Sequence, residues 1–204
     1  MRIVEKHSHI NGEEYLIVHY NDIYKEIMDI INNVDERQLR TGIRMRKSKE
    51  SRVLYSLEEL NREFRNLLNH KGWRQIRCPY YVTIDYSTVQ ELISVPLENQ
   101  RELLVDRGVA SPILSYKQID FVKRDVAVEV RFEECAYVAY DLFVKYPFFY
   151  NSGVISVGIE IIPMKCMLAE MSPEIAYYEN EVYNVLRHGR NNPPVPLLIV
   201  GIAP

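Results

Sequence analysis

The sequence has few cysteines, and nothing in their spacing would join them. Cys78, Cys135 and Cys166 are an odd number, lie far apart and form no Cys-x-x-Cys pair. Neither a disulfide framework nor a zinc site is therefore predicted. No apolar run approaches the roughly 20 residues that a membrane helix needs, and the stretch from Met1 to His7 has no apolar core like that of a signal peptide. We expect a cytoplasmic protein that does not contact a membrane.

The chain also lacks internal repeats, low-complexity tracts and a convincing linker. Its 204 residues are enough for a sizeable core, and its apolar content of 47% and charged content of 26% are ordinary for a globular protein. This composition favours a folded chain over a disordered one. We predict one domain over residues 1–204.

Positive charge gathers in one segment although the net charge is −3. The segment from Arg37 to Arg52 contains one acid, Glu50, and seven basic residues, namely Arg37, Arg40, Arg44, Arg46, Lys47, Lys49 and Arg52. Such a run is either a solvated loop or an arm that contacts phosphates. On the second interpretation, the DNA-contacting candidates are Arg44, Arg46, Lys47 and Lys49.

The apolar pattern predicts an α/β layout. Helices are expected at about 22–34, 56–72, from Ser87, at 96–108, at 135–146 with Pro147 as its end, and at 173–187. Strands are expected at 80–85, in a hairpin over 118–132, at 154–162 and at 196–203. An antiparallel hairpin followed by strands reached through helices gives a mixed sheet flanked by helices.

The hairpin carries the most informative pair of residues. If its turn is centred on Arg124 and Asp125, Phe121 faces Val128 on an apolar side, while Asp120 faces Glu129 on an acidic side. Like charges directly opposite each other are destabilising unless a positive charge lies between them. A divalent cation is the simplest candidate, and oxygen ligands favour Mg²⁺.

Two carboxylates and a cation on a rigid hairpin resemble the minimum needed for metal-assisted phosphodiester hydrolysis. Arg131 shares the face of Glu129 and would lie beside the attacked phosphorus. Its guanidinium is always protonated, so it can orient groups or stabilise negative charge but cannot take a proton from water. We therefore predict catalytic roles for Asp120, Glu129 and Arg131, with Asp120 and Glu129 binding the metal.

At these residues the chain resembles type II restriction endonucleases of the BglII and BstYI group in the PD-(D/E)xK superfamily, with the BstYI branch as the nearer likeness. The resemblance is carried by 120–132, 140–145 and 157–165, and extends through 1–5, 71–73, 81–83 and 200–204. It implies a restriction-endonuclease-like core and a homodimer that grips palindromic duplex DNA. It also implies Mg²⁺ at Asp120 and Glu129, and hydrolysis at a GATC-centred site that leaves 5′-phosphates.

The chain departs from the group at Arg131, where the superfamily usually has Lys and this group has Gln. Because the group works without Lys at this position, we expect an active enzyme. Two alternatives stay open: a protein that binds DNA specifically but cuts it poorly because of Arg131, and a repair-related phosphoesterase with a different substrate.

Several further residues are candidates for a role in the site or in DNA binding. Glu133 and Glu134 follow the hairpin and could accept a hydrogen bond from cytosine N4, and Ser172 could contact a groove or cap a helix. Arg187 and Arg190 could touch phosphates. Asp141 and Lys145 are expected to form an internal ion pair. Finally, Glu160 is either an auxiliary metal-binding carboxylate or a polar residue at the solvent-exposed end of its strand.

Overall fold

The structure is a computed structural model that describes residues 1–35, 39–44, 51–171 and 174–204. These residues divide into two compact units. The first unit consists of Met1–Gln75 and Asp120–Pro204, and the second of Ile76–Ile119. In the described residues, no helix is long and apolar enough to cross a membrane.

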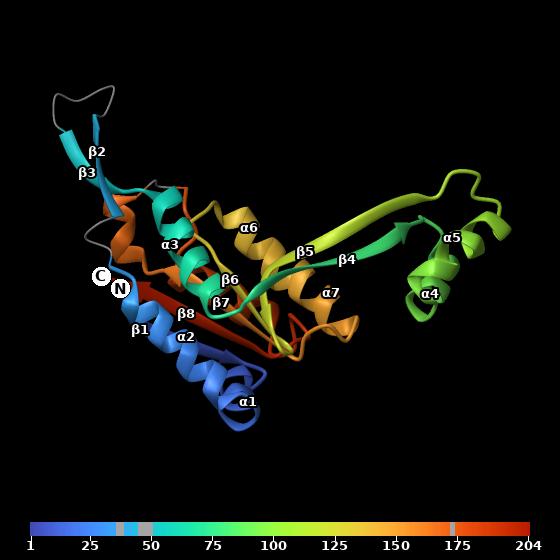
Figure 1. The fold of residues 1–204 in the computed structure, drawn as a ribbon, viewed down its shortest axis with the longest axis horizontal. Helices are drawn as coiled ribbons and strands as arrows, with labels where there is room; N and C mark the ends of the chain where they lie inside the picture. Colours follow the sequence, from blue (N-terminus) through green and yellow to red (C-terminus); the bar gives the residue numbers. More distant parts are fainter. Residues whose placement is uncertain (36–38, 45–50, 172–173) are drawn as a thin grey trace. The chain divides into compact units, whose positions relative to one another are not determined.

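A six-stranded mixed sheet organises the fold, and the predicted α/β class is confirmed (Figure 1). Its strand order is β1 (Arg2–His9), β8 (Leu197–Ala203), β7 (Val157–Pro163), β6 (Val126–Val130), β5 (Ile113–Lys123) and β4 (Arg74–Val82). The neighbours β6, β7 and β8 run parallel, while β1 is antiparallel to β8 and β5 to β6. Every residue of β6, β7 and β8 is buried, as expected for strands covered on both faces.

Helices cover the sheet in the first unit on both sides. On one side are α1 (Gly12–His19), α2 (Asn21–Asn33) and α3 (Leu57–His70), and on the other α6 (Cys135–Tyr140), the π-helix η2 (Asp141–Lys145), α7 (Tyr146–Asn151) and α8 (Tyr178–His188). Phe64 of α3 lies 5.8 Å, ring to ring, from Phe132, whereas Lys145 of η2 contacts Glu129. Because side chains alternate along a strand, Phe132 and Glu129 point to opposite faces.

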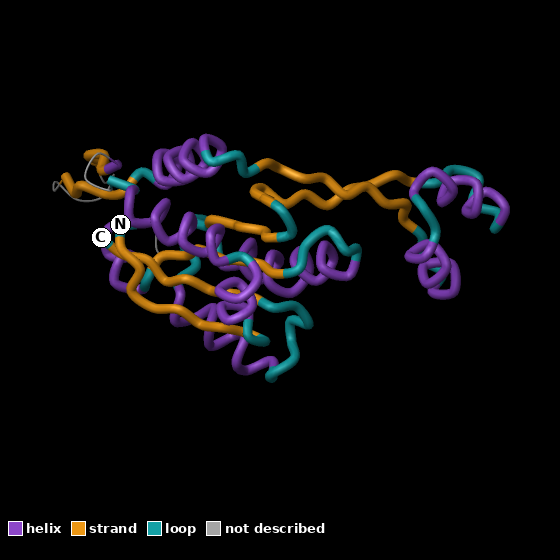
Figure 2. Tube along the Cα trace, turned by 60° about the horizontal axis from the view of Figure 1, so that its bottom comes forward, coloured by secondary structure: helices purple, strands orange, loops and turns teal. Residues whose placement is uncertain are grey.

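In the second unit, two strand segments run side by side and lead to two helices, α4 (Tyr86–Ser94) and α5 (Leu97–Asp106) (Figure 2). Helix α4 begins one residue earlier than predicted. Its N-cap is Asp85, whose carboxylate accepts the Thr88 N–H at 2.8 Å. Hydrogen bonds from the hydroxyls of Ser87 and Thr88, and then from this N–H, lower the pKa of Asp85 to about 2.

Several elements differ from the expected layout. Strand β1 and helix α1 were not predicted, and β4 covers Arg74–Val82 rather than the predicted residues 80–85. Strands β2 (Arg40–Arg44) and β3 (Ser51–Tyr55) form an antiparallel pair where only a basic segment was expected, and the 3₁₀ turn η3 (Lys165–Glu170) was not predicted. The helix from Cys135 does not end at Pro147. It passes through η2 into α7, and Pro147 lies in the first turn of α7.

The helix predicted to begin at residue 173 begins at Tyr178 instead. Just before it, Ile175 forms an isolated β-bridge with Glu134, and the Ala176 N–H donates to the Glu133 carbonyl at 2.9 Å. These bonds require extended backbone, so residues near 175 cannot be helical.

Candidate active site

The hairpin of β5 and β6 has the predicted register. Phe121 pairs with Val128, Val122 with Ala127 and Lys123 with Val126, which leaves Arg124 and Asp125 as the turn. Arg124 has a φ of 47°, in the left-handed region that two-residue hairpin turns need. Lys123 points to the face of the second helix, where its ammonium lies 2.8 Å from a carboxylate oxygen of Glu26. This partner explains how a lysine is accommodated on the apolar side.

Asp120 and Glu129 lie next to each other where this pairing ends. The Asp120 N–H donates to Oε1 of Glu129 at 3.1 Å, so a side chain takes the place of a main-chain acceptor. Glu129 is fully buried, and the Asp120 side chain is 28% exposed. The acidic face of the hairpin is therefore covered at Glu129 and open towards Asp120.

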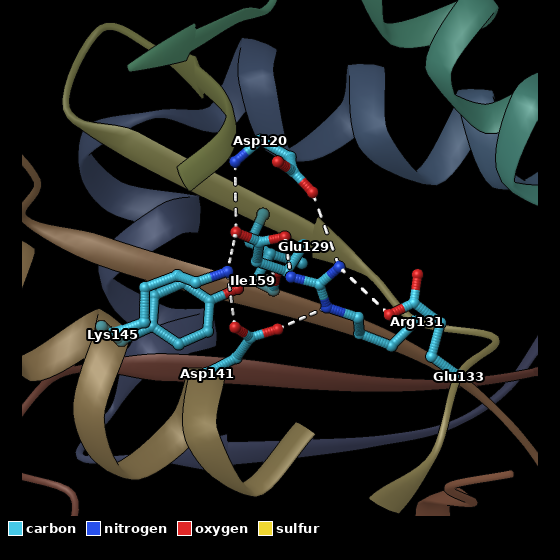
Figure 3. A network of polar contacts seen from close by, with 8 residues as sticks. Asp120, Glu129, Arg131, Glu133, Asp141, Lys145 and Ile159 are labelled. Carbon is cyan, nitrogen blue, oxygen red and sulfur yellow. Dashed lines mark hydrogen bonds and ion pairs between the residues drawn. The ribbon is translucent and has the colours of Figure 1, made fainter. Parts of the chain in front are cut away.

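Arg131 supplies positive charge to both acids (Figure 3). The backbone N–H of Arg131 donates to the Ile161 carbonyl at 2.9 Å, which continues the pairing of β6 with β7. Its guanidinium lies 2.8 Å from Oε2 of Glu129 through Nη2, and 3.5 Å from Oδ2 of Asp120 through Nη1. The expected positive charge between the two acids is thus provided by the chain itself.

Asp141 and Lys145 complete a closed ring of charges with Glu129 and Arg131. Asp141 holds Arg131 Nε through Oδ2 at 2.5 Å and Lys145 Nζ through Oδ1 at 2.6 Å. Lys145 Nζ in turn lies 2.9 Å from Oε1 of Glu129. The predicted ion pair between Asp141 and Lys145 is confirmed, and Figure 3 shows both side chains pointing towards Glu129 from η2.

Sequence reasoning did not place Asp141 and Lys145 in the candidate site. Their spacing of four residues on a buried segment was the available signal, but it did not reveal that the segment packs against Glu129. Helices of the π type are rare and occur frequently at functional sites. Here the π-helix carries both an acidic and a cationic residue of the site, Asp141 and Lys145.

Glu160 is the nearest neighbour of Glu129 across the β6–β7 ladder. It is fully buried, so the interpretation that it lies at the solvent-exposed end of its strand is wrong. Within the described residues, neither of its carboxylate oxygens accepts a hydrogen bond. The hydroxyl of Tyr146, which belongs to the same buried region, donates its proton to the Ile159 carbonyl at 2.7 Å.

Two buried acids of the site, Glu129 and Glu160, have raised pKa values. Burial, followed by repulsion from Asp141, raises the pKa of Glu129 to about 8. The same two causes raise the pKa of Glu160 well above its usual range. Although burial opposes it, Glu129 and Asp141 raise the pKa of Lys145, which therefore stays an ammonium.

These charges fit a divalent cation. The carboxylates of Asp120, Glu129 and Asp141 converge on the cations Arg131 and Lys145, and Glu160 is buried beside them. The described residues contain no cluster of three metal-binding side chains. Mg²⁺, however, commonly uses one or two carboxylates and keeps several waters, and Asp120 and Glu129 could supply these.

The residues predicted to contact DNA are only partly described. Glu133 and Glu134 line a surface hollow together with Asn61 and Tyr137, and Glu133 lies 3.9 Å from Arg131 Nη1. Arg187, in the last turn of α8, and Arg190, in the loop after it, are exposed. The predictions for Arg46, Lys47, Lys49 and Ser172 fall outside the described residues, as does the side chain of Arg44.

Comparison with known proteins gives a match over nearly the whole chain. Residues 4–202 match the family model described as Restriction endonuclease BglII/BglIII. The crystal structure of restriction endonuclease BglII complexed with a DNA 16-mer is similar in fold, with 18% sequence identity and a TM-score of 0.68 over 100% of this chain and 79% of that chain. The crystal structure of free BglII has 17% sequence identity and a TM-score of 0.58, over 100% of this chain and 80% of that chain. No curated protein matches the chain.

Proposed function

Because the chain belongs to the BglII/BglIII family of restriction endonucleases, and is therefore a site-specific deoxyribonuclease, we propose that it cuts double-stranded DNA with Mg²⁺ as cofactor. We further propose a palindromic, GATC-centred site and products with 5′-phosphates. The assignment to the PD-(D/E)xK superfamily and the nearer likeness to BstYI are part of the same proposal.

The observation that carries the Mg²⁺ assignment is the convergence of Asp120 and Glu129 on one positive charge. Both acids contact the same guanidinium, at 3.5 Å and 2.8 Å, so their oxygens already converge on one positive charge. Bound Mg²⁺ would lower the pKa of a water and neutralise charge on the phosphate. Asp120 would be the ligand nearer to solvent, because its side chain is the more exposed of the two.

Arg131 would act on the phosphate rather than on the attacking water. Its Nε is anchored by Asp141 at 2.5 Å, and its Nη2 lies 2.8 Å from Glu129, whereas the contacts of Nη1 with Asp120 and Glu133, at 3.5 Å and 3.9 Å, are longer. Nη1 is therefore the nitrogen best placed to contact a phosphate oxygen while Nε stays held. A guanidinium there stabilises negative charge and orients groups, but it accepts no proton.

The remaining predicted residues would bind DNA. We assign phosphate contacts to the basic side chains, listed here as Arg44, Arg46, Lys47, Lys49, Arg187 and Arg190, because lysine and arginine hold the backbone without reading sequence. Glu133 and Glu134 would accept hydrogen bonds from base edges at the hollow that they line. Ser172 is a further candidate for a groove contact.

A palindromic site is matched by a protein with two-fold symmetry. We therefore propose a homodimer in which each chain, residues 1–204, acts as a single endonuclease domain and contributes one set of Asp120, Glu129 and Arg131. The cytoplasm, where the DNA substrate is found, is the proposed location.

The test is digestion of a plasmid that carries many GATC-centred hexamers, with Mg²⁺ and with EDTA. We expect discrete fragments only with Mg²⁺, and sequencing of the fragment ends should place every cut at a GATC-centred hexamer. Ligation without added kinase should succeed, because the ends carry 5′-phosphates. Intact plasmid at high enzyme concentration would contradict the proposal.

A second candidate function follows from the place of Arg131 in the site. Since its guanidinium occupies the position between the two acids, a chain in which it never moves would bind DNA specifically without cutting it. A gel shift that shows specific binding without cleavage, together with cleavage restored by Arg131→Gln, would select this alternative.

A further inference from the structure

The two carboxylate oxygens of Glu129 have different surroundings. Oε1 is held from two directions, by Lys145 Nζ at 2.9 Å and by the Asp120 N–H at 3.1 Å. Oε2 lies 2.8 Å from Arg131 Nη2, but it accepts no hydrogen bond of good geometry within the described part of the chain. Oε1 is thus fixed in place, whereas Oε2 can exchange its neighbour Arg131 for another cation.

Lys145 is itself held rigidly. Its ammonium also contacts Oδ1 of Asp141 at 2.6 Å, its side chain is only 9% exposed, and it extends from the π-helix η2. A long lysine side chain at the surface has many rotamers, whereas this one is tied at its end to two buried carboxylates. It can therefore fix the rotation of the Glu129 carboxylate about its terminal bond.

Arg131 cannot provide this fixed contact. It lies on Oε2, the oxygen that a bound cation would need, and must leave that oxygen when the cation arrives. The Arg131 Nε bond to Asp141 shows where the side chain stays anchored. The constant contact of Glu129 is therefore the one with Lys145.

We propose that Lys145 is a positioning residue of the endonuclease reaction, one that fixes Oε1 of Glu129 so that Oε2 is presented on the side of Asp120 as the metal-binding oxygen. This inference rests on the proposed Mg²⁺ site. Lys145 acts through Glu129 and touches neither the DNA nor the reacting atoms.

The experiment is calorimetric titration of the full-length protein with Mn²⁺, used as a probe for a hard divalent cation. Removing a side chain that orients a metal ligand typically weakens metal affinity about 10- to 100-fold. We expect a loss in this range for Lys145→Met. Lys145→Arg, which keeps a cation beside Glu129 in a different geometry, should have an intermediate affinity.

Two comparisons separate positioning from a general effect on folding. Lys145→Met made in a Glu129→Gln background should cost little further affinity, because the residue through which Lys145 acts is already altered. The control is Lys123→Met, since Lys123 also forms a partly buried ion pair with a glutamate, Glu26 at 2.8 Å. It should lower stability and leave the Mn²⁺ affinity unchanged. For cleavage, Lys145→Met should lower kcat without raising the KM for DNA.

Wild-type Mn²⁺ affinity in Lys145→Met would overturn the role of Lys145 while leaving the proposed function intact. If Lys145→Met does not fold, wild-type affinity in Lys145→Arg would overturn it equally. Absence of Mn²⁺ binding and of cleavage in the wild-type protein would instead overturn the proposed function, and the role of Lys145 with it.

Discussion

Replacing Arg131 with glutamine should destabilise the protein by an amount that depends on the metal. The Arg131 side chain is 11% exposed and lies within 2.8 Å of both Glu129 and Asp141. Removing one partner of a buried ion pair typically costs about 3–5 kcal/mol. Because the pKa of Glu129 is already raised to about 8, this carboxylate can take up a proton, so we expect a loss near the lower limit, about 3 kcal/mol.

The assay is urea unfolding followed by circular dichroism, first in EDTA and then with Mg²⁺. A ligand present at about 100 times its dissociation constant adds about 2.7 kcal/mol to the unfolding free energy. Arg131→Gln should gain more from Mg²⁺ than the wild-type protein does, because the guanidinium no longer competes for Oε2 of Glu129.

The matched control is Arg124→Gln in the same hairpin. Arg124 lies 2.6 Å from Asp22, but both side chains are at least half exposed, and exposed ion pairs contribute little to stability. This variant should lose little stability and respond to Mg²⁺ as the wild type does. Wild-type stability of Arg131→Gln in EDTA, or an equal gain from Mg²⁺ in both proteins, would refute the reasoning.

Three further predictions concern the two acids of the site, Gly158 and Glu181. Asp120→Asn and Glu129→Gln should each abolish DNA cleavage in the plasmid assay while gel shifts show normal DNA binding; normal cleavage in either variant would contradict the assigned roles. Gly158→Ala should destabilise the fold by about 1–3 kcal/mol in urea unfolding, since its new methyl group would lie 2.6 Å from ring atoms of Tyr146; no loss would mean that the ring moves freely. Burial raises the pKa of Glu181 above 4.5. The contribution of its protonated carboxyl group to the free energy of unfolding is therefore fully present below pH 4.5 and is lost as the pH rises through the raised pKa. Glu181→Gln should flatten that decline in unfolding free energies measured from pH 4.5 to 8, and an unchanged slope would exclude the effect.

The hairpin could be predicted from the sequence because its information is local. A period of two fixes which of Asp120, Phe121, Val128 and Glu129 share a face, and the two-residue turn then fixes the register. Strand β1 gave no such signal, because most of its side chains are exposed or half-buried and do not alternate cleanly. Its place in the sheet depends on pairing with β8, almost 200 residues later.

Only part of the candidate site could be predicted from the sequence, because the rest depends on contacts between distant segments. The alternation of β7 separated Glu160 from Ile159 and Ile161, but only the strand order places Glu160 beside Glu129. Similarly, the spacing of Asp141 and Lys145 predicted their ion pair, while their contact with Glu129 depends on how η2 packs on the sheet. The ring of charges is therefore a product of tertiary packing.

The most direct measurement is X-ray diffraction from crystals soaked in Mn²⁺, with the anomalous signal of the metal. We expect one strong peak between Asp120 and Oε2 of Glu129, at coordination distances of about 2.0–2.4 Å, with the Arg131 guanidinium displaced and Lys145 still on Oε1. A difference map without a peak at these acids, and with Arg131 still lying between them, would contradict the metal site on which the proposed function depends.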